Sequence, residues 1–205
     1  SIVAPNDLRQ VYKEIKNSKL LGKITDKKFV YLFQSSANSF LMKEIGRLRE
    51  VAFRLVNEGT GKKIDLDTYD QYYQHIILWE KEELEIMGSY RVGDSSVILA
   101  EKGFKGFYSS SLFDFSQEAL EFFNQGLELG RSFLQPKYWG QRGLDCLWQG
   151  IGAYLVSKPN IRYLFGPVSI SGSFPKYAKD LIIAYYQIYF NYDDNNKYAK
   201  AKSPY

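Results

Sequence analysis

The sequence has very little of the residues that build disulfides, thiol chemistry and metal sites. Cys146 is the single cysteine and His75 the single histidine among 205 residues. A lone cysteine excludes an internal disulfide framework and a multi-thiolate metal site, and it fits a reducing compartment. One histidine cannot supply the several imidazoles of a typical zinc site. We therefore predict no metal centre and a cytoplasmic location.

Motifs that would carry several other chemistries are also missing. No stretch approaches the ~18 apolar residues of a membrane-spanning helix. The chain has no G-x-S-x-G hydrolase elbow, no H-E-x-x-H, no G-x-x-x-x-G-K-[ST] phosphate loop and no G-x-G-x-x-G fingerprint. The chain opens at Ser1 without a methionine or a signal-peptide pattern, which we interpret as a domain excised from a larger protein.

Charge is distributed unevenly, although the net charge is only +4. Residues 1–63 carry 13 Lys/Arg against 6 Asp/Glu, whereas residues 64–94 carry 2 against 8. A nucleic-acid groove needs a continuous basic face, so we exclude nucleic acid as a partner. A basic rim beside an acidic pocket would suit an acidic carrier protein or an anionic membrane surface, and a merely solvated surface is an equal alternative. The candidate docking residues are Lys27, Lys28, Lys62 and Lys63.

The periodicity of apolar residues predicts an α/β fold. Strands are expected at 28–33, 75–80, 84–92, 127–134 and 161–169. Helices are expected at 38–56, 116–124, 144–156 and 175–190, the last with Tyr185, Tyr186, Tyr189 and Phe190 mostly in the core. This order predicts a three-layer α-β-α sandwich around one mixed sheet. The whole chain, 1–205, is predicted to be one domain, with an N-terminal extension at 1–27 and a polar tail at 191–205.

Two charged residues lie within the predicted strand 127–134. Alternate side chains of a strand share a face, so Glu128 and Arg131 point to opposite faces unless a bulge intervenes. We expect a bulge near Gly130 that turns Arg131 toward the aspartates of the acidic segment. A carboxylate among apolar residues needs a partner or holds its proton more tightly. Both a structural Glu128–Arg131 ion pair and a general base remain open from this pattern.

Three further features have a structural and a functional interpretation. Gly140 and Gly143 precede a predicted helix, where backbone N–H groups can hold a pyrophosphate or thioester oxygen, but a glycine pair alone is not specific. Cys146 is expected to be a small core residue. His75 and Glu80 have the H-x4-D spacing of glycerolipid O-acyltransferases, although the acid is Glu and the intervening IILW predicts a buried strand.

Several motifs in order along the chain carry a family resemblance. GRLRE-x-x-F lies in residues 44–61, D-x-D-x-Y-D in 65–79, Y-R in 88–93 and ELGRSF in 127–133, followed by blocks at 147–154 and 164–170. Together they cover about residues 28–190. This combination resembles the hemolysin-like, ornithine-lipid-synthesising N-acyltransferases of the GNAT superfamily, which are close to the acyl-homoserine-lactone synthases.

The resemblance implies roles for individual residues. Those near the amine substrate would be Arg49, Phe53, Asp65, Asp67, Asp70 and Arg91. Glu128 would be the general base with Arg131 beside it, and His75 is the alternative base. The carrier thioester would contact Phe133, Leu134, Gly140, Arg142 and Gly143. The loop there departs from the superfamily's R/Q-x-x-G-x-G/A pattern, so acyl carrier protein is at least as good a candidate donor as CoA.

The function implied by the resemblance is transfer of a fatty acyl group to the amino group of an amino acid, giving an N-acyl amino acid or a lyso-aminolipid. Acyl carrier protein or CoA would be a co-substrate, and no cofactor would be bound permanently. A backbone N–H just beyond Phe133–Gln135 would stabilise the oxyanion. Similar domains occur beside or fused to a glycerolipid O-acyltransferase, and peripheral contact with the inner face of the membrane is expected. The alternatives are a lysolipid O-acyltransferase and an inactive lipid- or carrier-binding module.

Overall fold

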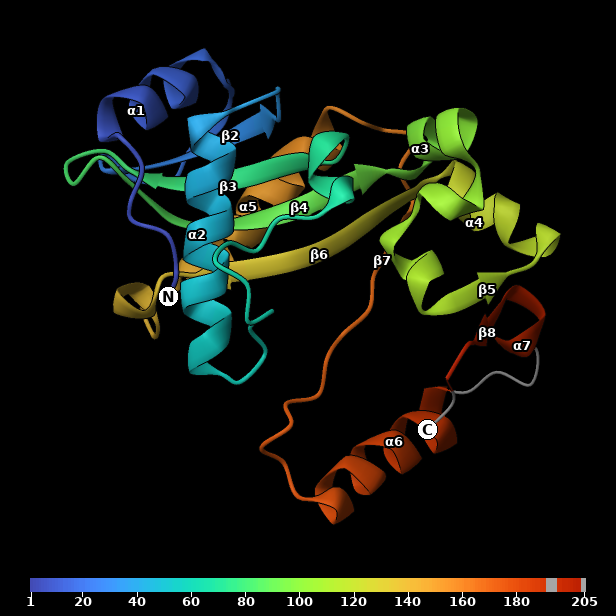
Figure 1. Ribbon diagram of the computed structural model, residues 1–205. Coiled ribbons are helices and arrows are strands. Elements are labelled where there is room, and N and C mark those ends of the chain that lie inside the picture. Colours follow the sequence, from blue (N-terminus) through green and yellow to red (C-terminus); the bar gives the residue numbers. More distant parts are fainter. Residues whose placement is uncertain (191–194, 204–205) are drawn as a thin grey trace.

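A six-stranded mixed sheet runs through the middle of the molecule (Figure 1), in a computed structural model that describes residues 1–190 and 195–203. Its strands in spatial order are β1 (Lys19–Lys23), β2 (Lys28–Gln34), β3 (Gln74–Glu80), β4 (Glu85–Asp94), β6 (Gly126–Leu134) and β7 (Tyr163–Phe165). Every neighbouring pair is antiparallel except β6 with β7, which is parallel. The sheet is therefore mixed, as predicted.

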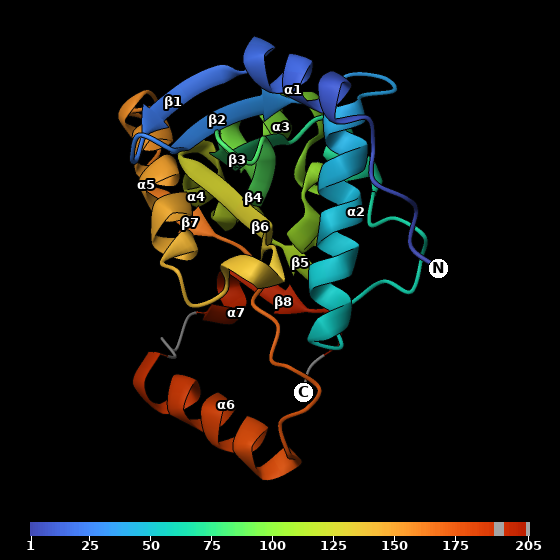
Figure 2. The ribbon, with the colours of Figure 1, turned by 90° about the vertical axis from the view of Figure 1, so that its left-hand side faces the viewer.

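Helices cover both faces of this sheet (Figure 2). Helices α1 (Leu8–Asn17) and α2 (Phe40–Leu55) lie on one face and α5 (Gly143–Val156) lies on the other. Strand β3 shows why: Ile77 belongs to the core under α2, whereas Ile76 belongs to the core under α5. The α-β-α layering around one mixed sheet is confirmed (Figure 2).

A third core closes one end of the sheet. It contains Tyr73, Ile98, Phe107, Ala119 and Phe123. The surrounding elements are α3 (Ser95–Lys102), α4 (Leu120–Asn124) and the 3-10 turns η2 (Phe104–Gly106), η3 (Tyr108–Ser111) and η4 (Gln117–Ala119). The helix predicted at 116–124 is thus split between η4 and α4. Two more 3-10 turns, η1 (Thr68–Gln71) and η5 (Pro136–Tyr138), precede β3 and α5.

Both ends of the chain are more structured than the sequence indicated. The segment 1–27, expected to be an extension, supplies α1, which packs on α2, and the edge strand β1. Within the expected tail, α7 (Asn195–Tyr198) leads into β8 (Ala199–Ala201), which pairs with β5 (Phe113–Phe115). Residues 191–194 and 204–205 of that tail lie outside the described residues.

Helix α6 (Lys176–Phe190) stands away from the rest of the molecule (Figures 1 and 2). Within this described helix no residue is buried, and Tyr189 is 69% exposed. The expectation that its aromatic residues, Tyr185, Tyr186, Tyr189 and Phe190, belong to the core was therefore wrong. The cause is that β7 spans three residues instead of the predicted 161–169, so residues 166–175 leave the sheet as a connector.

Across residues 1–190 and 195–203, each helix is too short or too polar to cross a bilayer.

Candidate active site

Strand β6 contains the bulge that the spacing of its charged residues predicted. Gly130 pairs with Arg91 of β4, and the next registered pair is Phe133 with Ser89, so β6 has one extra residue between the two pairs. Arg131, with a φ of 48°, adopts the left-handed conformation there, which is uncommon for a residue other than glycine. The bulge near Gly130 is confirmed, and Arg131 rather than the glycine takes the unusual backbone angle.

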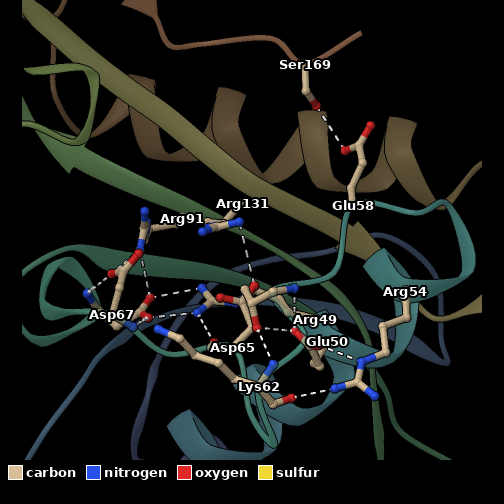
Figure 3. A network of polar contacts seen from close by, with 12 residues as sticks. Arg49, Glu50, Arg54, Glu58, Lys62, Asp65, Asp67, Arg91, Arg131 and Ser169 are labelled. Atoms are coloured by element: carbon tan, nitrogen blue, oxygen red, sulfur yellow. Dashed lines mark hydrogen bonds and ion pairs between the residues drawn. The ribbon is translucent and has the colours of Figure 1, made fainter. Parts of the chain in front are cut away.

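Strands β6 and β7 part immediately before this bulge. Their parallel pairing ends at Glu128 with Phe165. Gly166 then passes so close to β6 that a Cβ there would lie 2.1 Å from the carbonyl oxygen of Leu129. Further on, the Ser169 hydroxyl donates to Glu58 beyond the end of α2, at 2.9 Å (Figure 3). In the described part of the chain, the second half of β6 therefore has no strand neighbour on this edge.

A buried ion pair joins α2 to the acidic loop. Arg49 donates two parallel hydrogen bonds to Asp70, of 2.9 and 2.7 Å. The side chains of Arg49 and Asp70 are 0% and 3% exposed. Burial alone would raise the pKa of Asp70, but the hydrogen bonds and charge of Arg49, with the charge of Arg91, lower it well below its usual range. Asp70 is therefore an anion that these guanidinium groups hold in place.

A glycine on α2 lets the acidic loop come this close. A Cβ on Gly46 would lie 2.9 Å from the carbonyl oxygen of Asp65 and 2.7 Å from Cδ2 of Leu66. The Asp65 N–H donates to the carbonyl of Gly46, and the Asp65 carbonyl accepts a hydrogen bond from Arg49. The helix and the loop are thus joined through their backbones at the position where the ion pair forms.

Arg91 crosses the same loop from the sheet. Its Nη1 donates to Asp67 at 2.6 Å and to Asp70 at 3.1 Å (Figure 3). Asp67 and Asp70 also form the capping box of the 3-10 turn η1. The guanidinium group lies 5.3–5.6 Å from the centres of three rings, those of Tyr69, Tyr73 and Tyr108. Arg49, Asp65, Asp67, Asp70 and Arg91 therefore come together as the resemblance implied.

Glu128 has partners that the sequence did not reveal. One carboxylate oxygen accepts from the Ser109 N–H at 2.7 Å and from the Ser109 hydroxyl, and the other accepts from the Tyr73 hydroxyl and from the Tyr108 N–H at 3.2 Å. A carboxylate has about four lone-pair sites, so all are occupied. Arg131 instead faces Asp65, so the expectation that the bulge turns Arg131 toward the acidic segment is confirmed and the alternative of a Glu128–Arg131 ion pair is wrong. The role of Glu128 as general base stays a prediction without support from this geometry.

His75 is fully buried in β3, beside Arg91 of β4. Its Nε2 lies 3.7 Å from a carboxylate oxygen of Asp70, and burial lowers the pKa of His75 to about 3, so the imidazole is neutral. Glu80 is at the other end of β3, five residues away, which corresponds to about 16 Å along a strand. His75 and Glu80 therefore do not form a dyad, and the O-acyltransferase hypothesis loses its basis.

The loop expected to contact the carrier thioester comes together only in part. Gly140 and Arg142 have φ angles of 76° and 55°, which turn the chain into α5, and Gly143 is its first residue. The side chain of Leu134 lies against Gly143, where a Cβ would be 2.9 Å from Leu134 Cδ2. Phe133 instead packs in the core under α2, since successive residues of β6 face opposite ways.

The expected oxyanion donor beyond Phe133 is also occupied. The N–H of Gln135 donates to the carbonyl of Met87 at 2.8 Å. A hydrogen-bonded ladder therefore continues past the end of β6 on the β4 side. The free N–H groups of β6 have to be sought on its other edge, after the strand parts from β7.

Tyr73, Tyr108 and Ser109 are the site residues that sequence reasoning missed. The run YDQYY at 69–73 was a usable signal, because so many tyrosines in a polar loop need partners. Nothing in the local sequence marks Tyr108 and Ser109. They approach Glu128 from 19–20 residues away only once η3 has folded over β6.

A cavity of about 450 Å³ lies on the far side of the acidic loop. It is lined by residues 35–39, by the start of α2 with Lys43, and by residues 66–67 and 70–71 of the loop. Asp67 and Asp70 reach it, whereas neither Arg131 nor Glu128 is among the residues that line it.

The fold and this site define a class of protein. The profile of the "Acetyltransferase (GNAT) domain" family matches residues 48–149, which span the acidic loop, the bulge and most of α5. Because the mixed sheet, its parting strands and the motif-bearing residues agree with that match, the chain belongs to the GNAT superfamily of acyltransferases.

The chain is also similar to individual proteins that are named as amino-acid Nα-acyltransferases. The chain is 36% identical to the glycine Nα-acyltransferase of Phocaeicola vulgatus over 94% of its own length and 63% of the relative's, and 35% identical to that of Bacteroides thetaiotaomicron over 90% and 58%. It is 33% identical to the L-ornithine Nα-acyltransferase of Agrobacterium fabrum over 63% of its own length and 45% of the relative's. The chain thus spans less than two thirds of the length of these relatives.

Proposed function

We propose that this chain transfers a fatty acyl group from a carrier thioester to the amino group of an amino acid. The product is an N-acyl amino acid or a lyso-aminolipid. One observation carries the proposal: a cluster of guanidinium and carboxylate groups lies at the bulge of β6, in a chain whose relatives are named glycine and ornithine Nα-acyltransferases. Such a cluster suits a substrate that carries both an ammonium and a carboxylate group.

The chemistry sets the tasks of the site. The amine nitrogen bonds to the thioester carbonyl carbon and the C–S bond breaks. Of the two protons that leave the ammonium group, one reaches a base and the other ends on the thiolate. Glu128, which already accepts four hydrogen bonds, and the fully buried His75 are the two candidates for this base. Backbone N–H groups on the unpaired edge of β6 beyond Glu128 are placed to stabilise the oxyanion.

Acyl carrier protein and CoA remain alternative donors. The turn before α5 presents Arg142, whose side chain is 84% exposed, at a helix N-terminus that suits phosphate groups. Docking of an acidic carrier would instead use Lys27, Lys28, Lys62 and Lys63, although Lys27 already forms an ion pair with Glu82 at 2.7 Å. Carrier docking would weaken steeply with salt, because exposed charges are screened.

The chemical nature of the product suggests a membrane surface and a second acyltransferase as partners. An N-acyl amino acid is amphiphilic, so we propose a cytoplasmic protein that meets the inner face of the membrane peripherally. A fused or neighbouring O-acyltransferase would then add a second acyl chain.

The test is an acyl-transfer assay on the purified chain. Acyl carrier protein or CoA charged with a long-chain acyl group is supplied with glycine or ornithine, and mass spectrometry scores the amide product at low and high salt. Amide formation above that of a heat-inactivated sample supports the proposal. Thioester binding without any amide, for every donor and amine, would leave the inactive binding module as the better hypothesis.

A further inference from the structure

Arg131 is the most solvent-accessible of the three arginines in the cluster. Arg49 Nε and Arg91 Nη2 lack a hydrogen-bond partner among the described residues, but both belong to buried side chains. Arg49 and Arg91, 0% and 1% exposed, are held by the acidic loop. Arg131 is 25% exposed, and its Nε has no hydrogen-bond partner in residues 1–190 and 195–203. Its guanidinium group lies 5.9 Å from the ring centre of Phe53 and 5.7 Å from that of Tyr108, within the range of cation–π attraction. Arg131 thus lies between two aromatic rings and lacks a close hydrogen-bond partner among the described residues.

Asp65 is the aspartate of the cluster whose unpartnered oxygen is buried. Asp70 and Asp67 accept hydrogen bonds from arginines and from backbone N–H groups. Asp65 is 2% exposed, and its Oδ2 accepts no hydrogen bond within the described part of the chain. The nearest cations are Arg49 Nε at 3.5 Å and Arg131 Nη1 at 3.8 Å, both beyond hydrogen-bond distance. A buried anionic oxygen in this state favours an additional donor.

We propose that Arg131 and Asp65 together form the receptor for the two charged groups of an α-amino acid. The guanidinium group of Arg131 binds the carboxylate through Nε and an Nη, and Asp65 Oδ2 accepts a hydrogen bond from the ammonium group. This inference rests on the proposed function, and it assigns the substrate's charges to two residues while Arg49, Arg91 and Asp70 hold the receptor in shape. Burial raises the pKa of Asp65 despite the two nearby guanidinium groups, which agrees with a carboxylate that lacks a close cation.

Space for the amino acid lies next to this pair. Gly130 is registered opposite Arg91, so both are on the sheet face that α2 covers, as is Arg131. No heavy atom of the described residues lies within 4 Å of the position where a Cβ on Gly130 would stand, setting aside its chain neighbours. The absent side chain leaves room for a small substrate in front of the receptor, directly beside the edge of β6 from which β7 has parted.

The proposed contact between Arg131 and the substrate carboxylate is tested first, with the unsubstituted chain. Turnover of glycine is compared with that of glycinamide and of methylamine, with the same acyl donor. Loss of a charge-assisted, two-pronged contact corresponds to about 10²-fold in kcat/KM. We expect glycine to exceed glycinamide by about that factor. If glycinamide and methylamine are as good as glycine, the inference is wrong although the proposed function stands. If no amine is acylated, the proposed function fails and the inference falls with it.

Substitutions then assign the contacts. Arg131→Gln is expected to lower kcat/KM for glycine about 10²-fold while leaving that for glycinamide within about threefold, so the discrimination disappears. Arg131→Lys should retain only part of the discrimination between glycine and glycinamide, because an ammonium group lacks the planar arrangement of donors of a guanidinium group. Asp65→Asn should weaken glycine and glycinamide alike. The matched control is Arg9→Gln, at an exposed position on α1, which should leave kcat/KM for both substrates unchanged.

A substitution that fills the space in front of Arg131 tests where the substrate binds, without changing Arg131 or Asp65. Gly130→Val should raise KM for ornithine more than for glycine, since the new side chain occupies the space in front of Arg131. Gly22→Val is its control, because Gly22 is also a strand glycine whose Cβ would meet no heavy atom within 4 Å in the described residues. Retained glycine–glycinamide discrimination in Arg131→Gln, or an unchanged KM for both amino acids in Gly130→Val, would contradict the assignment.

Discussion

Glu128→Gln separates a structural carboxylate from a catalytic base. Each oxygen of Glu128 accepts from one backbone N–H and one hydroxyl. An amide keeps one acceptor oxygen and replaces the other with donors. The better orientation places the NH2 toward Tyr108, because the Tyr108 N–H then retains the Tyr73 hydroxyl as an acceptor at 3.1 Å. The charge assistance to Tyr73 and Tyr108 is nevertheless lost, and hydrogen bonds to a charged group contribute about 1.5–3 kcal/mol.

We therefore expect Glu128→Gln to lower the free energy of unfolding by about 2 kcal/mol, a large part of the 5–15 kcal/mol typical of a domain. Glu128→Ala, which leaves three of the four donors without an acceptor, should cost at least twice as much. Urea unfolding followed by circular dichroism measures both, with exposed Glu121→Gln as the control. A variant with unchanged stability but acyl transfer lowered 10²-fold would refute this reasoning and restore Glu128 as the base.

Two further substitutions test the packing and the electrostatics. Gly46→Ala should destabilise the domain relative to Gly152→Ala by about 1–3 kcal/mol in thermal unfolding, because both gain helix propensity but only the first pushes on Asp65 and Leu66; equal values would contradict the close approach. His75, with a pKa lowered to about 3, stays neutral in the native state while the unfolded chain binds a proton below about pH 6.5. The contribution of His75 to the free energy of unfolding should thus fall by about 1.4 kcal/mol for each unit by which the pH is lowered from about 6 to about 4. In His75→Gln the slope of the unfolding free energy with pH should be smaller by this amount; identical slopes would mean that the native imidazole is protonated.

The sequence predicted the sheet and the helices next to it because their side chains alternate or recur over long stretches. Strand β3 and helix α2 are of this kind, since each buries a regular face. Helix α1 and strand β1 were missed for a physical reason: α1 buries only Val11 and Ile15, and β1 is a short edge strand with no buried residue. Patterns of local periodicity carry little information about such thinly covered elements.

The candidate site was predictable where spacing has a geometric consequence. The spacing of three positions from Glu128 to Arg131 required a bulge if both were to serve one site, and the bulge is present. The partners of Glu128 were not predictable, because Tyr108 and Ser109 reach it through a turn that folds over the sheet. The exposure of α6 was missed for a related reason: helical spacing indicates which side chains share a face, but not which element covers that face.

The position of α6 has a consequence for the timescale on which parts of the chain open. An isolated helix of its 15 residues is marginal in water, and within the described structure no side chain of α6 is buried to hold it closed. Its amide hydrogens should exchange with solvent at free energies of opening far below that of the whole domain. The amides of β3, where residues 75–80 are all buried between two layers of helices, should exchange last. A hydrogen-exchange profile would then show α6, residues 176–190, as a rapidly opening helix next to a slowly opening body.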